Sequence, residues 1–243
     1  MKLGLVTYNM AKDWDVPTII ENCIETGFSG VELRTTHAHG VEVDLSADER
    51  AAVKQQFADS PIEIAGLGSA YDYHATDQAV LRRNIAGTKA YSQLAADVGA
   101  PGVKVRPNGL PNEVPVEKTL EQIGLSLREC GEFAANLGVG TSELPHIRTI
   151  LDVADHDNVY VCWNSNFGEV EDGSIQNNFN LVKGRIGLVH ITELHRREYP
   201  WRELFTSLKA SGYTGYTLAE IAGSSDPIRV MNFYRALWEE LSR

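Results

Sequence analysis

The chain has 243 residues, of which 43% are hydrophobic, and a formal net charge of −11. These values fit one globular domain with a sizeable core, and the negative charge disfavours binding to the phosphate backbone of nucleic acids. No apolar run approaches the roughly 18 residues of a membrane-spanning helix, and three widely spaced cysteines without a CxxC motif are typical of reduced thiols in a cytoplasmic protein.

Short apolar or β-branched runs alternate along the chain with longer amphipathic runs. The predicted strands cover residues 2–8, 30–34, 62–70, 102–107, 158–164, 186–194 and 216–221. The predicted helices cover residues 16–27, 46–59, 77–99, 116–138, 145–155, 174–184, 201–212 and 226–243. The first run is predicted to be a strand and not a signal peptide, because no cleavage site of small residues follows it.

This alternation predicts an α/β fold, a TIM-type parallel (β/α) barrel formed by residues 1–243 as a single domain. A closed barrel of this class needs eight strands, and the pattern supplies seven. In the stretch Ala135–Ile150 only a few residues separate two helical patterns, so we expect the fifth strand to be absent and the barrel to be distorted or seven-stranded. Either strands four and six pair directly, or another segment or a second copy of the chain fills the gap, which would make a homodimer.

Reactive side chains gather at the carboxyl ends of the predicted strands, which share one mouth in a parallel barrel. The candidates for the site are Glu32, His37, His39, Lys104, Arg106, Trp163, Asn164, Asn166, His190 and Glu220. Because Lys104 and Arg106 are two residues apart on one strand, their side chains point the same way, and the helix layer would not tolerate two buried cations. We therefore expect both in the mouth, binding anions or hydroxyl groups.

Glu220 lies among apolar neighbours, and a buried carboxylate needs a cation, a metal ion or a proton. It is thus the best candidate for a catalytic residue. His190 could be catalytic or a hydrogen-bonded core histidine. His37 and His39 could bind substrate or a metal ion, or be ordinary residues of a surface loop.

Three motifs carry a resemblance to a known family: "GFSGVELR" at 27–34, "VHITEL" at 189–194 and "LKASGYTGYTLAEI" at 208–221. With them the chain resembles the xylose isomerase-like TIM-barrel superfamily of sugar phosphate isomerases and epimerases, and within it a bacterial subgroup. The superfamily also holds apurinic endonucleases. The resemblance covers almost the whole chain, but the motifs separate the activities of the superfamily poorly.

The resemblance implies a divalent metal ion, Mn, Mg or Zn, held by a Glu, an Asp, a His and a Glu from strands five to eight. Carried over to this sequence, the ligands are Glu220 and His190, with Asn164 in place of the Asp. No Glu stands at strand five, and the nearby Glu143 begins a helix, where capping is its natural role. Since a divalent ion favours at least two carboxylates, we expect the metal site to be weakened or absent.

Three functions follow from the residues and the resemblance. The first is an isomerase or epimerase acting on a small sugar, sugar phosphate or polyol, with Glu220 as ligand or base and Glu32 as a second catalytic carboxylate if it reaches the same cavity. In this function Lys104 and Arg106, together with His37, His39, Trp163 and Asn166, bind substrate. The second is a barrel without catalysis that binds a carbohydrate or a protein partner. The third, an apurinic-site endonuclease, needs about three metal ions and many ligands, and is the least favoured.

Overall fold

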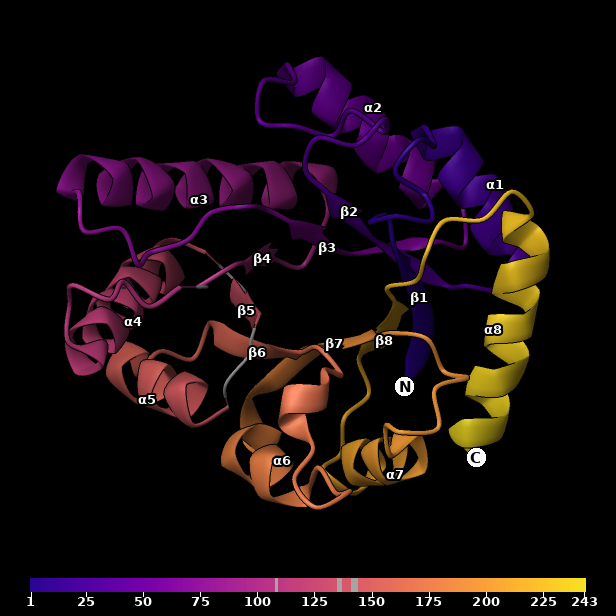
Figure 1. Cartoon of the computed structure of the whole chain (residues 1–243). Helices are drawn as coiled ribbons and strands as arrows, with labels where there is room; N and C mark the ends of the chain where they lie inside the picture. The colour runs from indigo at the N-terminus through magenta and orange to yellow at the C-terminus, as the bar shows by residue number, and fades with distance from the viewer. Residues whose placement is uncertain (108, 135–136, 141–143) are drawn as a thin grey trace.

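The computed structural model describes residues 1–107, 109–134, 137–140 and 144–243. Within this part of the chain, eight parallel strands close into one barrel in the order of the sequence, and helices surround it (Figure 1). The strands are β1 (Lys2–Val6), β2 (Gly30–Arg34), β3 (Glu63–Gly68), β4 (Val103–Val105), β5 (Leu137–Gly140), β6 (Val159–Trp163), β7 (Ile186–Ile191) and β8 (Tyr216–Ala219). The predicted TIM-type α/β barrel is confirmed.

A helix follows each strand, as right-handed crossover connections between parallel strands require. The α-helices are α1 (Val16–Thr26), α2 (Ala47–Ala58), α3 (Gln78–Val98), α4 (Val116–Phe133), α5 (Leu144–Ala154), α6 (Gln176–Val182), α7 (Trp201–Ala210) and α8 (Pro227–Leu241). Two short 3₁₀ helices, η1 (Phe167–Glu169) and η2 (Lys183–Arg185), flank α6. The last helix, α8, packs beside the first, α1, and so closes the outer ring (Figure 1).

The helix ends follow the signals in the sequence. Asp15 accepts a hydrogen bond from the backbone N–H of Thr18 at the start of α1, and Gly27 ends that helix with φ of 75°. Ser46 and Glu49 form the predicted capping box of α2. These local stops keep the connections short, so that each strand end stays near the barrel mouth.

The expectation that the fifth strand is absent is corrected by the structure. Residues Leu137–Gly140 form β5, which pairs in parallel with β4 (Val103 opposite Leu137) and with β6 (Gly140 opposite Cys162). Helix α4 ends at Phe133, several residues before the predicted end at 138, which frees this short segment to become a strand. The gap between strands four and six that suggested a homodimer is therefore closed, and that argument for a dimer no longer applies.

The strand was missed because it has four residues, two of them glycine, and glycine has a low strand propensity. Backbone hydrogen bonds to β4 and β6 hold this strand in the sheet. Such bonds do not depend on the identity of the side chains, so the sequence does not reveal them. The barrel has local irregularities elsewhere, since the register shifts between Val31 and Glu32 and between Val161 and Cys162. The helix start at 142–143, including Glu143, lies outside the described residues.

Two apolar clusters follow from the alternation of side chains along the strands. Outward-facing strand residues such as Leu5, Leu33 and Val161 are buried beneath the helices in the main core. A small second cluster of Val6, Ala65, Leu188, Tyr216 and Leu218 belongs to the barrel interior. The interior at the carboxyl ends of the strands is instead occupied by charged side chains, and this position defines the site.

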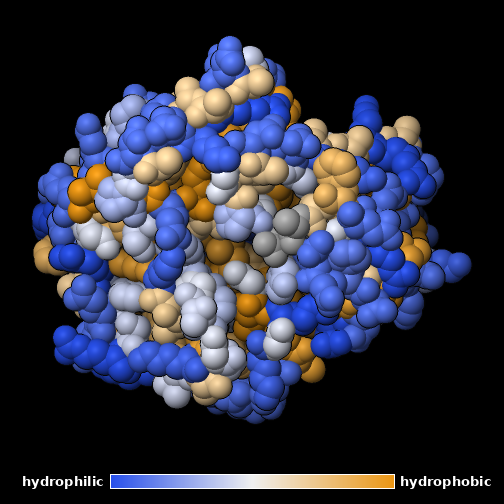
Figure 2. Space-filling model, turned by 180° about the vertical axis from the view of Figure 1, so that it is seen from behind, coloured by the Kyte–Doolittle hydropathy of each residue, from blue (hydrophilic) through white to orange (hydrophobic). Residues whose placement is uncertain are grey.

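On the face seen in Figure 2 most residues are hydrophilic, and hydrophobic residues show mainly between polar ones. The large exposed apolar side chains are spread over several elements, for example Ile24 on α1, Leu125 on α4 and Phe233 on α8. Among the described helices, none combines the length and the apolar character that a membrane crossing requires.

Candidate functional site

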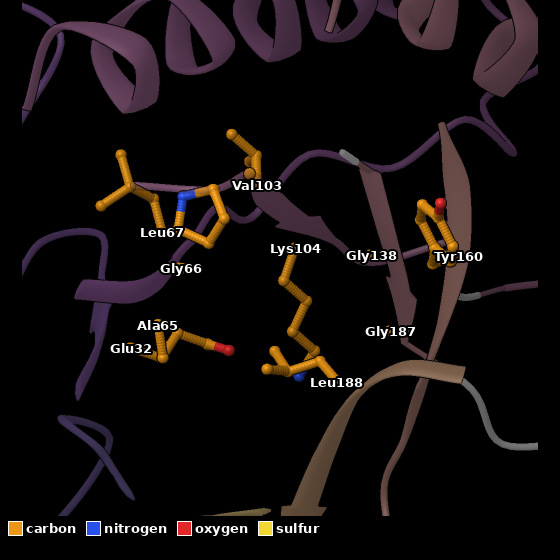
Figure 3. A pocket seen from close by; sticks show the side chains of 12 residues that line it. Glu32, Ala65, Gly66, Leu67, Val103, Lys104, Gly138, Tyr160, Gly187 and Leu188 are labelled. Carbon is orange, nitrogen blue, oxygen red and sulfur yellow. The ribbon is translucent and has the colours of Figure 1, made fainter. Parts of the chain in front are cut away.

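Four ionisable side chains from four strands meet inside the barrel. Nε2 of His190 on β7 lies 2.7 Å from Oε2 of Glu32 on β2, and its Nδ1 lies 3.0 Å from Oε2 of Glu220, the residue after β8. Nζ of Lys104 on β4 lies 3.2 Å from the same Nδ1. Figure 3 shows the side chains of Glu32 and Lys104 extending into the barrel interior. The structure thus brings together residues that lie up to 188 positions apart, from Glu32 to Glu220.

The members of this charged cluster, Glu32, Lys104, His190 and Glu220, differ in their access to solvent. Glu32 and His190 are completely buried, Lys104 is 8% exposed, and the side chain of Glu220 is 27% exposed. Glu220 and Lys104 are therefore the members that a molecule in the mouth can touch. Glu32 and His190 lie behind them.

The neighbouring charges determine the protonation states. Burial raises the pKa of Glu32, but the positive charges around it, of which His190 is the nearest, outweigh burial and lower the pKa to about 2. Burial likewise raises the pKa of Glu220, but the hydrogen bond and the positive charge of His190 outweigh burial and lower it. Burial lowers the pKa of His190, yet Cys162 and Glu32 raise it well above its usual value. Both carboxylates are consequently ionised at neutral pH, and the imidazole between them is protonated.

A cavity of about 270 Å³ lies at the carboxyl ends of the strands. Its lining residues are Tyr8, Arg34, Lys104, Arg106, Asn164, Asn166 and Glu220. Among the described residues that line it, three are cations and one is a carboxylate, so this mouth cavity attracts anionic or hydroxyl-rich molecules although the whole chain is acidic. The predicted position of Lys104, Arg106, Asn164, Asn166 and Glu220 at one mouth agrees with this lining.

Two lining residues were not among the predicted site residues. Tyr8 follows β1, and the guanidinium carbon of Arg34 lies 5.8 Å from the centre of its ring. Arg34 ends β2, and its backbone N–H donates to Oγ1 of Thr7 over 3.0 Å. Their position after the first and second strands was a signal available in the sequence, but a charge at a strand end is as often a solvated rim residue.

The loop histidines have structural partners. His39 is buried, and its ring nitrogens contact the carbonyl oxygen of Arg34 at 2.8 Å and the N–H of Val41 at 3.0 Å. Burial lowers the pKa of His39, and both nitrogens are engaged in holding the loop. Nδ1 of His37 lies 2.8 Å from Oγ1 of Thr7, and its ring stacks against Tyr8. Neither histidine lines the mouth cavity.

Trp163 is not in the mouth. Its indole is completely buried on the outer side of β6, where it packs against Phe179 and donates from Nε1 to the hydroxyl of Tyr199 over 2.9 Å. The next residue, Asn164, faces the mouth, because side chains alternate along a strand. The indole therefore acts in the core.

A second cavity, of about 140 Å³, lies within the barrel and is bordered by both Glu32 and Lys104 (Figure 3). Glycines and small residues of β3 to β7 leave it open, among them Ala65, Gly66, Gly138 and Gly187. On the other side of the barrel, Tyr216 and Leu218 fill the interior over Gly4 and Gly30, where an added Cβ would lie 2.5 Å from a side chain. Lys104 lines this lower cavity and the mouth cavity, and thus separates them.

Among the residues that the structure describes, the charged cluster does not fit a divalent metal ion. Glu32 and Glu220 contact opposite nitrogens of the His190 ring, so the three cannot converge on one point, and Nζ of Lys104 lies beside the nitrogen that faces Glu220. Strand β5 carries no carboxylate, and Asn164 is an amide. In the part of the chain that the structure describes, no group of three His, Cys, Asp or Glu side chains could hold a metal ion.

Comparisons with known proteins agree with this fold. The family described as xylose isomerase-like TIM barrel matches residues 20–237. No curated protein matches the chain in a sequence search.

Solved structures of similar fold include the IolI protein with a bound zinc atom, with a TM-score of 0.82 and 15% identity over 100% of this chain and 98% of that one. They also include 3-keto-D-glucoside 4-epimerase YcjR from E. coli, with a TM-score of 0.78 and 19% identity over 99% of this chain and 98% of that one. An L-ribulose 3-epimerase matches with a TM-score of 0.82 and 17% identity over 100% of this chain and 95% of that one. At these identities the likeness shows the fold.

Proposed function

The chain belongs to the family of xylose isomerase-like TIM barrels, and from this premise and the charged mouth we propose that it is an isomerase or epimerase of a small sugar or sugar phosphate. The reaction is the transfer of a proton at a carbon next to a carbonyl group. One observation carries the proposal: the carboxylate of Glu220 and the cations of Lys104, Arg34 and Arg106 line one cavity of about 270 Å³. The names of the structural neighbours, several of which are sugar epimerases, support the substrate class.

Glu220 is the base. Its lowered pKa keeps it ionised at neutral pH, and its side chain is partly exposed to the mouth cavity. It accepts the proton from the substrate carbon, whose bonding electrons form an enediolate with the neighbouring carbonyl. Return of the proton from Glu220 to the neighbouring carbon gives the isomer, and delivery of a proton from solvent to the other face of the first carbon, while Glu220 releases its own proton to solvent, gives the epimer. No oxidant or reductant is needed.

The positive side of the cavity stabilises the enediolate oxygen. Fixed charges aimed at the place where negative charge develops are the largest single contribution in many enzymes. Arg34 and Arg106 present several N–H donors each, which suit the hydroxyl or phosphate groups of a sugar. Asn164 and Asn166 add amide groups at the opposite strand ends.

His190 and Glu32 act as positioning residues in this proposal. Neither lines the mouth cavity, and Nδ1 of His190 contacts Oε2 of Glu220 at 3.0 Å from the side away from the mouth. Glu32 in turn fixes the imidazole at 2.7 Å. The carboxylate of Glu32, expected to be catalytic if it reached the substrate cavity, is assigned the role of orienting His190.

Solvent exchange of hydrogen tests the proposal. A panel of aldoses, ketoses and their phosphates is incubated with the protein in D₂O and followed by NMR. We expect one compound to take up deuterium next to its carbonyl group and to convert into its epimer or isomer. Glu220→Gln should slow this by about 10²-fold or more, because the base is removed. Glu198→Gln, an exposed glutamate of the loop after β7, is the matched control and should have no effect.

If no compound of the panel exchanges hydrogen, the proposal is wrong. Calorimetric binding of a sugar by such a protein, unaltered in Glu220→Gln, would favour the alternative function of a carbohydrate-binding barrel without catalysis.

A further inference from the structure

We infer that the Lys104 ammonium group supplies the positive charge that a divalent metal ion would otherwise supply in this mouth, so that the site works without a metal. The inference rests on the proposed function, and its kinetic test needs turnover of a sugar. A second test measures metal binding and does not need turnover. It makes Lys104 the residue that stabilises the enediolate oxygen.

The position of Lys104 is the first argument. Its Nζ lies 3.2 Å from Nδ1 of His190, and that nitrogen lies 3.0 Å from Oε2 of Glu220. These are the two atoms that an ion held by strands β7 and β8 would need. A divalent ion bound to both would lie within a few ångströms of the ammonium group, and in a partly buried site such repulsion is strong. The lysine therefore competes directly with a metal ion for the same place.

The charge balance of the cluster is the second argument. Two carboxylates, Glu32 and Glu220, face one ammonium group and one imidazolium group, so the four charges add up to zero. The four side chains are joined through the His190 ring, which lies 3.2 Å from the Lys104 ammonium group, 3.0 Å from Glu220 and 2.7 Å from Glu32. Adding a divalent ion would leave two uncompensated positive charges at a site that is mostly buried.

The burial of Lys104 is the third argument. A lysine that is 8% exposed is costly unless a negative charge compensates it. This one borders both cavities, and so its ammonium group stands where a molecule in the mouth can accept a hydrogen bond from it. A buried cation at the mouth indicates a role for its charge.

The experiment measures metal binding and turnover in wild type, Lys104→Met and Lys104→Arg, with Lys209→Met, an exposed lysine of α7, as the matched control. Calorimetry with Mn²⁺ and with Zn²⁺, and thermal unfolding with and without EDTA, read out the metal. For wild type we expect no stoichiometric binding, no shift of Tm with EDTA and no change in turnover. Lys104→Met should bind Mn²⁺ at least about tenfold more tightly than wild type, because the repulsion is gone.

Lys104→Met should also lose about 10²-fold or more in kcat, whereas Lys104→Arg keeps part of the activity because it keeps the charge. Stoichiometric Mn²⁺ or Zn²⁺ on wild type that is lost in Glu220→Gln, or turnover abolished by EDTA and restored by metal, would overturn the inference and leave the proposed function intact. If instead no sugar is converted, the metal measurements still decide about Lys104. If Lys104→Met fails to fold, wild type and Lys104→Arg decide it.

Discussion

The carboxylate of Glu32 lies 2.7 Å from Nε2 of His190, and neither side chain is exposed to solvent. The pair joins strands β2 and β7 across the barrel interior, where most barrels of this class carry branched apolar residues. A buried ion pair adds little net stability, but removing one partner leaves the other charged and uncompensated. The pair therefore fixes the orientation of the imidazole that Glu220 and Lys104 share.

Glu32→Gln should lower the free energy of unfolding by about 3 to 5 kcal/mol at pH 7, since it leaves a buried imidazolium without its carboxylate. Urea denaturation measures the loss. Glu63→Gln is the control, because Glu63 also pairs with a cation, Lys2 at 2.7 Å, but its side chain is 59% exposed. That exposed pair should cost less than about 1 kcal/mol. Equal losses of unfolding free energy in the two variants would show that the buried pair contributes no more to stability than the exposed pair.

The same pair predicts a dependence on acid. The pKa of Glu32 is lowered to about 2 in the folded protein, below its ordinary value of about 4.5 in the unfolded chain. Its contribution is therefore fully present above about pH 4.5 and disappears as the pH falls toward 2. The stability difference between wild type and Glu32→Gln should shrink over that interval. A difference that stays constant down to pH 2 contradicts the assignment.

Gly68 at the end of β3 makes room for two site residues. A Cβ added to Gly68 would lie 2.3 Å from Cδ of Arg34 and 2.6 Å from Oε1 of Glu32. Gly68→Ala should therefore displace both side chains, weaken sugar binding and cost about 1 to 3 kcal/mol of stability.

Gly66→Ala is the control on the same strand. An added Cβ there meets nothing closer than the carbonyl oxygen of Gly102 at 3.7 Å, and it points into the lower cavity. This variant should keep both its stability and its ligand affinity. Chemical denaturation and calorimetric titration with the converted sugar distinguish the two variants, and equal behaviour would refute the steric argument.

The fold could be predicted because its signals are local and repeated. Apolar strands, amphipathic helices and caps such as Ser46 with Glu49 recur along the chain and require a parallel barrel. Strand β5 escaped prediction for the opposite reason. Leu137–Gly140 has no pattern of its own. It becomes a strand because the open backbone groups of β4 and β6 pair with it on either side when the barrel closes, and those two strands are separate from it in the sequence.

The site could be predicted in part. Strand alternation placed Lys104 and Arg106 on one face, and both line the mouth cavity. Glu220, chosen as a carboxylate among apolar neighbours at a strand end, lines the same cavity. The same rule, applied to β6, separates Asn164 from Trp163, which faces the helices. The contact of Lys104 with His190 could not be predicted from the sequence, because it depends on how far a long side chain reaches across the barrel.

Behind Trp163 lies a chain of buried polar groups outside the barrel. The indole donates to the hydroxyl of Tyr199, and that hydroxyl donates to Oε2 of Glu169 in η1, each over 2.9 Å. Glu169 is completely buried, and burial raises its pKa to about 7 despite the hydrogen bond from Tyr199. The loop after β6, which carries Asn166 to the mouth, is thus anchored on a carboxyl group that titrates near neutral pH.

A carboxyl group whose pKa is higher in the folded protein stabilises the fold only while it is protonated. The contribution of Glu169 is fully present below about pH 4.5 and is lost as the pH rises through 7. Glu169→Gln cannot ionise, so its stability relative to wild type should increase by about 2 to 3 kcal/mol between pH 5 and pH 8. Urea denaturation of both proteins at several pH values measures this difference, with Glu198→Gln as an exposed control that should show none. A stability difference that does not change with pH would show that Glu169 stays in one protonation state between pH 5 and pH 8. In that case the anchoring of the loop after β6 does not depend on pH near neutrality.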